Sequence, residues 1–164
     1  MSTNTRFQLI KTPAPRKAEL LDETRWAQGI EWNDIQVFAK YMVLYSVLKG
    51  TNIFTQGDLN PFMALIKSGE VAILKEDSGR ENRVLATIGK DRTLGEMALI
   101  DGEPRSATAI TTVDTTLFIL SKEKFDAMAI EHPTSWGRLL LKLSKQMSQR
   151  LRKASGELVD TLPH

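Results

Sequence analysis

The sequence predicts a mainly β domain of the α+β type: a small jelly-roll-like β-roll, preceded by short helices and followed by one long helix. Between about residues 43 and 120, short runs rich in Val, Ile, Leu, Phe and Thr alternate with closely spaced turn signals such as Gln56-Gly57-Asp58. This alternation is typical of a β-sandwich or β-barrel. On both sides of the region, apolar residues recur at three- and four-residue steps, the period of an amphipathic helix. A length of 164 residues fits one domain with its own core.

The segment before the β-roll divides into an arm and two helices. Residues 1–16 contain Thr12-Pro13-Ala14-Pro15 and few apolar side chains, so we expect a flexible N-terminal arm, with the domain proper over 17–164. Helical spacing then predicts a helix from Lys17 to about Gln28. A second helix follows Asn33, a candidate N-cap.

The sequence predicts two helices after the β-roll and six strands within it. Ser121 is a plausible N-cap for a first C-terminal helix, and His132-Pro133 breaks that helix and starts a last one. The last helix is expected from about Thr134 to Leu162, so the C-terminal helices together cover about 122–162. The expected strands are Val43–Leu48, Phe62–Ile66, Val71–Leu74, Arg83–Ile88, Ala107–Thr112 and Thr115–Leu120.

Composition excludes several classes of function. The chain has no cysteine and two histidines, His132 and His164, which argues against a disulfide scaffold, a thiolate zinc site and a Ser-His-Asp hydrolase. We therefore expect no enzyme, no catalytic or metal-ligating residue and no cofactor. The N-terminus lacks a signal-peptide core, and no apolar run approaches the roughly 20 residues of a membrane helix, so a cytoplasmic location is expected.

The segment from Gly95 to Ala109 carries the most chemical information. It interrupts the strands with a helical turn, a Gly-containing loop and an arginine that enters the next strand. The guanidinium of Arg105 is a planar donor fork suited to a pair of phosphate oxygens. Backbone amides at the turn that begins with Gly95-Glu96 can bind an anion, and the Glu96 carboxylate can accept a hydrogen bond from a sugar hydroxyl. These residues suit a cyclic phosphodiester.

The pattern Gly-Glu-x-Ala-Leu-x-x-x-x-Pro-Arg-x-Ala, from Gly95 to Ala107, resembles the phosphate-binding cassette of the cyclic-nucleotide-binding domain family. That family includes catabolite activator proteins and the regulatory subunits of cyclic-AMP-dependent kinase. The resemblance covers roughly Asn33 to Leu162 and includes Phe54-Thr55-Gln56-Gly57-Asp58 and Ile66-Lys67-Ser68-Gly69-Glu70-Val71. The nine-residue spacing from Glu96 to Arg105 is that of the kinase subunits.

The resemblance implies roles for individual residues. Arg105 would bind the cyclic phosphate and Glu96 the ribose 2′-hydroxyl. The amides of Gly95, Ala98, Ser106 and Ala107 would surround the phosphate with help from the Ser106 hydroxyl, while Leu85, Ala86 and Leu94 would line the sugar and base; Met97 belongs to the same turn.

The last helix also resembles that of the catabolite activator around Gln146 to Leu151. On this register Arg150 would reach the Glu96 end of the site, and Ser155 would read the adenine edge from a partner subunit. A solvated basic face of the helix explains Arg150 about equally well. The sequence departs from the catabolite activator at Ala154, where a threonine is expected, and at Asp91, where a glycine is expected.

The resemblance implies a receptor for cyclic AMP, with cyclic GMP second, that signals allosterically to an effector protein. The chain ends at His164, where a catabolite activator would begin its DNA-reading helix-turn-helix, so we expect no DNA-binding domain. Three alternatives stay open. They are a cyclic-dinucleotide receptor on the same scaffold, a ligand-free dimerisation or docking module, and a nucleic-acid binder on the basic helix.

A homodimer through the last helix is also expected. Its apolar residues advance by four- and three-residue steps, close to a coiled-coil seam, and a single β-roll cannot cover a helix of about 40 Å. The alternative is that the helix folds back over its own pocket. The stripe consists of Trp136, Leu140, Leu143, Met147, Leu151, Ala154, Leu158 and Leu162.

Overall fold

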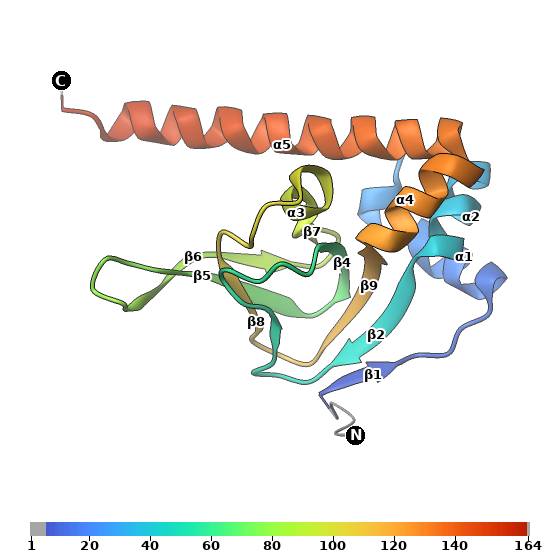
Figure 1. The fold of residues 1–164 in the computed structure, drawn as a ribbon, viewed down its shortest axis with the longest axis horizontal. Helices are drawn as coiled ribbons and strands as arrows, with labels where there is room; N and C mark the ends of the chain where they lie inside the picture. Colours follow the sequence, from blue (N-terminus) through green and yellow to red (C-terminus); the bar gives the residue numbers. More distant parts are fainter. Residues whose placement is uncertain (1–5, 164) are drawn as a thin grey trace.

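The computed structural model describes residues 6–163 and contains two antiparallel sheets, with helices packed outside one of them (Figure 1). The sheets have the strand orders β1-β2-β9-β4-β7 and β3-β8-β5-β6. The strands are β1 (Phe7–Leu9), β2 (Val43–Val47), β3 (Asn52–Phe54), β4 (Phe62–Ser68), β5 (Glu70–Glu76), β6 (Asn82–Gly89), β7 (Thr93–Leu94), β8 (Thr108–Thr111) and β9 (Thr115–Ser121). The helices are α1 (Ala14–Asp22), the 3-10 turn η1 (Arg25–Ala27), α2 (Trp32–Tyr41), α3 (Glu96–Asp101), α4 (Lys122–Glu131) and α5 (Pro133–Thr161).

The predicted β-roll with flanking helices is therefore confirmed, and the strand period explains its two cores. Along β9, Leu117 faces the space between the sheets, where Val47, Ile66 and Val71 are also fully buried. The next residue, Phe118, points to the other side and packs in a cluster with the helices. Successive strand residues point to opposite faces, so a strand buried on both sides is apolar without interruption.

The N-terminal segment differs from the prediction. Residues 7–16 do not form an arm: Phe7–Leu9 pairs with Tyr45–Val47 of β2, and α1 begins at Ala14. Pro15 lies in the first turn of α1, where a proline costs no hydrogen bond, so the Pro-rich run starts a helix. Glu31, rather than Asn33, is the cap of α2. Residues 1–5 of the predicted arm lie outside the described part of the chain.

Three strands, β1, β3 and β7, were not predicted, because two or three residues are too few to show a period. The C-terminal predictions are confirmed. The Ser121 hydroxyl accepts a hydrogen bond from the Lys124 amide at 3.2 Å, which caps α4, and His132 separates α4 from α5. None of the helices within residues 6–163 combines the length and apolar character that a membrane span requires.

Helix α5 is held at its beginning and free at its end. Leu139 and Leu143 are fully buried, and the carboxylate of Asp34, itself buried in α2, accepts hydrogen bonds from Ser135 at 2.7 Å and Arg138 at 2.9 Å. Every residue from 151 to 163 is exposed. The helix passes over α3 and continues past it alongside the β5–β6 hairpin (Figure 1). The free half carries an exposed apolar stripe of Leu151, Ala154, Leu158 and Leu162.

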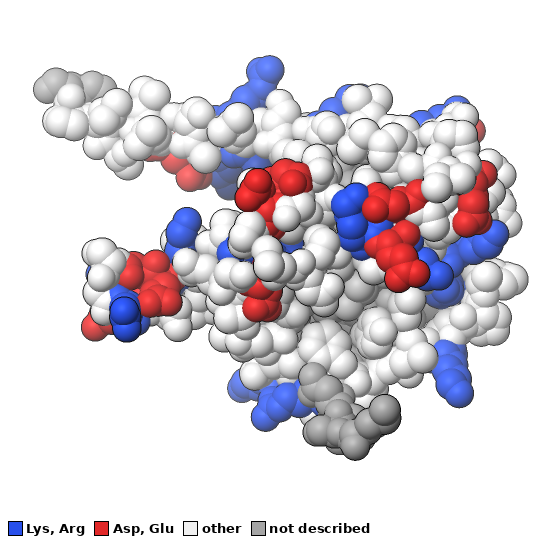
Figure 2. Space-filling model, viewed as in Figure 1, with Lys and Arg blue, Asp and Glu red and all other residues white. Residues whose placement is uncertain are grey.

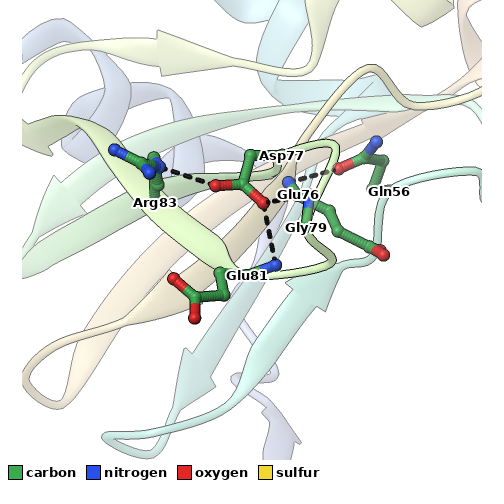
Figure 3. A network of polar contacts seen from close by, with 6 residues as sticks. All are labelled: Gln56, Glu76, Asp77, Gly79, Glu81 and Arg83. Carbon is green, nitrogen blue, oxygen red and sulfur yellow. Dashed lines mark hydrogen bonds and ion pairs between the residues drawn. The ribbon is translucent and has the colours of Figure 1, made fainter.

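The β5–β6 hairpin projects beside this free half of α5, with open space between the two (Figure 2). Its tip is organised by Asp77, whose carboxylate accepts hydrogen bonds from the amides of Gly79 at 2.8 Å and Glu81 at 3.0 Å and from Arg83 at 2.8 Å (Figure 3). The Gln56 side chain accepts from the Glu76 amide at 3.0 Å and ties the hairpin to the loop before β4. One carboxylate therefore fixes the turn.

The hairpin tip is predicted to loosen in acid. The hydrogen bond from Arg83, followed by that from the Glu81 amide, lowers the pKa of Asp77. Because this pKa is lowered on folding, the Asp77 carboxylate stabilises the folded tip at a pH above its unfolded pKa of about 3.9. This stabilisation is lost as the pH falls through the pKa of the folded state. We expect amide exchange at Gly79 and Glu81 to accelerate in that range, measured by NMR. Asp77→Asn should show the fast exchange already at neutral pH, whereas Asp114→Asn in another turn should not; unchanged exchange in Asp77→Asn would contradict the assignment.

Candidate functional site

A pocket of about 260 Å³ opens between the β-roll, α3 and α5. Helix α3 and the loop after it form one wall, and β5 and β6 contribute Ile73 and Ile88 to another. The lining is mostly apolar, with a few charged groups. It consists of Phe54, Ile73, Ile88, Leu94, Gly95, Glu96, Met97, Ala98, Asp101, Glu103, Pro104, Arg105, Ser106, Ala107 and Arg150.

Arg105 lies at the base of this pocket, and its side chain is buried. Its guanidinium lies 4.1 Å from the ring centroid of Phe54 and 4.6 Å from that of Phe62. It donates to the carbonyls of Gly95 at 2.8 Å, Phe62 at 2.7 Å and Asn60 at 3.2 Å. Burial lowers the pKa of Arg105, and the nearby carboxylates of Asp58 and Glu96 oppose this effect. The guanidinium is therefore a desolvated cation held mainly by neutral groups.

Gly95 makes this approach possible. Its φ is 79°, in the left-handed region, and a Cβ atom there would lie 2.6 Å from Arg105 Nη1 and 2.8 Å from the Phe62 carbonyl oxygen. Contacts under 3.0 Å require something to move, and here one neighbour is backbone. Only glycine fits both the conformation and the space at this position.

Glu96 begins α3 with its carboxylate buried, and Arg150 of α5 reaches down to it. Arg150 Nη1 donates to Glu96 Oε1, while Nη2 donates to the carbonyl of Thr93 at 2.9 Å and to its hydroxyl at 3.3 Å. This ion pair connects two elements that are far apart in the chain. Arg150 is also the last residue of α5 that is partly buried, because the helix is exposed from residue 151 to residue 163.

Two polar atoms in the pocket lining are left without a protein partner. Arg105 Nε is a buried donor and Glu96 Oε2 a buried acceptor, and neither forms a hydrogen bond within residues 6–163. Buried polar atoms of this kind cost free energy unless a ligand or water satisfies them. A ligand with an anionic oxygen for Arg105, a hydroxyl for Glu96 and an apolar body for the remaining lining would satisfy both.

The structure brings together most of the residues expected at the site. Gly95, Glu96, Met97, Ala98, Arg105, Ser106, Ala107, Leu94 and Arg150 all line the pocket. Leu85 and Ala86 are exposed on β6 and Ser155 is exposed on the free half of α5, all three outside the lining of this pocket. Among residues 6–163 no three His, Asp or Glu side chains gather as metal ligands.

Sequence analysis missed three groups of site residues. Ile73 and Ile88 lie on predicted strands and could have been found from the strand period. Phe54 was quoted for its place in the family pattern, without a role, and here its ring stacks on Arg105. Asn60 and Phe62 hold Arg105 through backbone carbonyls, which no side-chain pattern reveals.

Comparison with known proteins agrees with this geometry. The chain is 32% identical over 130 residues to the cyclic AMP receptor protein of Thermus thermophilus, covering 79% of this chain and 58% of that protein. In fold it is similar to a cyclic nucleotide-binding domain from Methylobacillus flagellatus, with a TM-score of 0.84 and 21% identity, over 100% of this chain and 94% of the other. It is also similar to the c-di-GMP-responsive global regulator CLP of Xanthomonas campestris, with a TM-score of 0.65 and 26% identity, over 76% and 63%.

The chain thus spans less than two thirds of the length of the Thermus receptor. The sequence profile of the cyclic nucleotide-binding domain matches residues 45–132, which is more than half of the 164 residues and includes the pocket residues of β5, β6, α3 and the loop before β8. The chain therefore belongs to the cyclic nucleotide-binding domain family.

Proposed function

We propose that the chain is a cytoplasmic receptor that binds a cyclic nucleotide, cyclic AMP above all, without acting on it chemically. The observation that carries the proposal is the pair of unsatisfied atoms, Arg105 Nε and Glu96 Oε2, in one largely apolar pocket. A cyclic phosphate supplies an acceptor to Arg105. The ribose 2′-hydroxyl supplies a donor to Glu96, and the base supplies an apolar face. The name of the Thermus relative favours cyclic AMP as the ligand.

The signal would pass through Arg150. Its guanidinium shares the Glu96 carboxylate with the site proposed for the ribose hydroxyl, so a bound ligand changes the environment of the last tether of α5. A ligand shifts a conformational equilibrium only by its differential affinity for the two states, and this shared carboxylate provides such a difference. The output would be a change in the position of α5, read by an effector protein.

A homodimer through α5 completes the proposal. The helix turns about 100° per residue. The side of α5 that faces the domain at Leu139 and Leu143 therefore continues along the free half as Glu157 and Thr161. The leucines of the exposed apolar stripe lie about a quarter turn away from that side and do not point into the pocket. A second copy of the chain covers such a stripe better than the polar face of the helix could cover its own pocket.

A cyclic dinucleotide is the second candidate ligand, favoured by the similarity to the c-di-GMP-responsive regulator. It would place a second phosphate in a pocket whose lining has one buried, unpaired cation, Arg105. The remaining pocket cation, Arg150, already pairs with Glu96. A ligand-free docking module is the third candidate and would leave the two buried polar atoms to water.

Thermal unfolding with a ligand panel tests the assignment of the site. Cyclic AMP at a hundred times its Kd should stabilise the protein by about 2.7 kcal/mol. The 2′-deoxy analogue should bind more weakly, and Glu96→Ala should remove most of this discrimination, whereas Glu103→Ala in the same lining should retain it. Equal binding of the two nucleotides to the wild type would remove Glu96 from the site. If only cyclic dinucleotides stabilise the protein, the ligand is a cyclic dinucleotide and not cyclic AMP.

Arg105 should matter for both binding and folding. Arg105→Ala is expected to cost about 2–5 kcal/mol of binding free energy in calorimetry, because the phosphate would lose a desolvated cationic partner. It should also cost about 1–3 kcal/mol of unfolding free energy, since three carbonyls lose their donor. Arg16→Ala, which removes an exposed arginine, is the control. Full affinity in folded Arg105→Ala protein would mean that the ligand lies elsewhere.

The dimer is tested by charging the apolar stripe. Leu151→Glu combined with Leu158→Glu should convert a dimer into a monomer in light scattering. Val159→Glu changes an equally exposed residue on another face of the same free half and should leave the dimer intact. A wild-type protein that is monomeric at high concentration, with and without cyclic AMP, would overturn the dimer while leaving the nucleotide site untouched.

A further inference from the structure

A second concavity, separate from the nucleotide pocket, lies on the other side of α5. It has a volume of about 550 Å³ and runs between the turn from η1 to α2 and the outer face of α5, where Arg138, Lys142 and Lys145 are found. Phe38 contributes to an apolar base, and the exposed Leu141 lies at the edge. We call this feature the α2–α5 groove.

The cations of the groove are unequally neutralised. Arg138 pairs with the buried carboxylate of Asp34 at 2.9 Å. Lys142 has no carboxylate partner within residues 6–163; its ammonium lies 5.1 Å from the centroid of the Trp26 ring, and burial lowers its pKa. Lys145 is exposed and, within the same described range, also forms no ion pair. Two adjacent cations, one of them partly desolvated, are thus available to an outside carboxylate.

We propose that an acidic, amphipathic segment of the effector protein docks in the α2–α5 groove, with its carboxylates on Lys142 and Lys145 and its apolar residues on Phe38 and Leu141. This inference rests on the effector named in the proposed function and gives that effector a surface and a chemistry. Such a segment combines apolar anchors with charge complementarity, as in other helix-in-groove complexes.

The charge of the groove favours a protein segment over a polyanion. Arg138, Lys142 and Lys145 stand against Glu31 and Asp34, which leaves a single net positive charge in the lining. Asp34 is already paired with Arg138, so a nucleic acid or an anionic membrane would bring a row of phosphates to two lysines and Glu31, more negative charge than the groove can pair. A few carboxylates on an apolar helix match the groove in charge and in polarity.

An effector segment in the groove and a second copy of the chain on the apolar stripe can contact α5 at the same time. Arg138, Lys142, Lys145 and Gln149 advance by four, three and four residues and form one line on the helix. At about 100° per residue this line lies nearly opposite to the apolar stripe, so an effector and a second copy of the chain do not compete. The lining of the groove extends to Gln149, next to Arg150 in the chain, so a movement of α5 at Arg150 would change the width of the groove at that end.

The test uses a fluorescein-labelled amphipathic peptide with Glu on one face and Leu on the other, and a matched peptide with Gln in place of Glu. Anisotropy titrations with the full chain should show binding of the Glu peptide alone. Lys142→Gln with Lys145→Gln should weaken this binding about tenfold, as two charge pairs are lost. Arg152→Gln with Lys153→Gln removes the same charge from the same helix outside the groove and should change it little.

NMR shift perturbation locates the contact and should place it at residues 28–31 and 138–149. Three outcomes would overturn the proposal. Peptide binding could fall equally in both double variants, or the shift perturbations could lie elsewhere. A single-stranded oligonucleotide could also bind more tightly than the peptide and lose this binding in Lys142→Gln with Lys145→Gln. Calorimetry with cyclic AMP on the same variants separates the two sites. If cyclic AMP binds but the peptide does not, the docking site in the groove is rejected and the proposed nucleotide site stands. If the peptide binds but cyclic AMP does not, the proposed ligand is rejected and the docking site stands.

Discussion

The burial of the Arg105 guanidinium is the constraint on which the rest of the site depends. A cation taken out of water must be surrounded by acceptors or aromatic faces, and here these come from three separate segments. Asn60 in the loop before β4 and Phe62 at the start of β4 supply two carbonyls, Gly95 supplies a third, and Phe54 and Phe62 supply the two rings. Gly95 must lack a side chain for this to occur, and its left-handed φ in turn directs α3 so that Glu96 faces the same pocket. One buried charge thus assembles the base and one wall of the site.

Glu96 connects this local arrangement to the long helix. The buried carboxylate has two acceptor oxygens; Arg150 occupies one, and the other is without a partner among the described residues. The ion pair at Arg150 ties α5 to the pocket beyond its buried residues Leu139 and Leu143, and every described residue after Arg150 is exposed. In the proposed function, the occupancy of the pocket and the position of the helix would be coupled through the Glu96 side chain, with no need for a rearrangement of the β-roll.

Sequence reasoning recovered the features that depend on periodicity or on a contiguous motif. The cassette from Gly95 to Ala107 is local, so its residues were found together, and the strand boundaries followed from apolar runs and glycine turns. The β1 strand was missed because three residues carry no period, and Pro15 was misread because proline suits both a loop and a first helical turn. Asp91 departs from the glycine of the family pattern, yet its φ of 67° is one that aspartate tolerates, so the turn keeps its shape. The carbonyl contacts of Arg105 join segments about 40 residues apart and leave no trace in residue types.

Helix α5 has three faces of different composition, and the surroundings of each face explain its residues. The face toward the domain is apolar at Leu139 and Leu143 and becomes charged at Arg150, where it meets a carboxylate instead of a core. The apolar stripe is exposed along the free half of the helix, so nothing in the described part of the chain covers it. The basic line that includes Lys142 runs along the remaining side, next to the groove. Because a rigid helix moves as a unit, a displacement at Arg150 is felt on all three faces at once. In the proposed function, this is how the occupancy of a small pocket would become a change of protein surface.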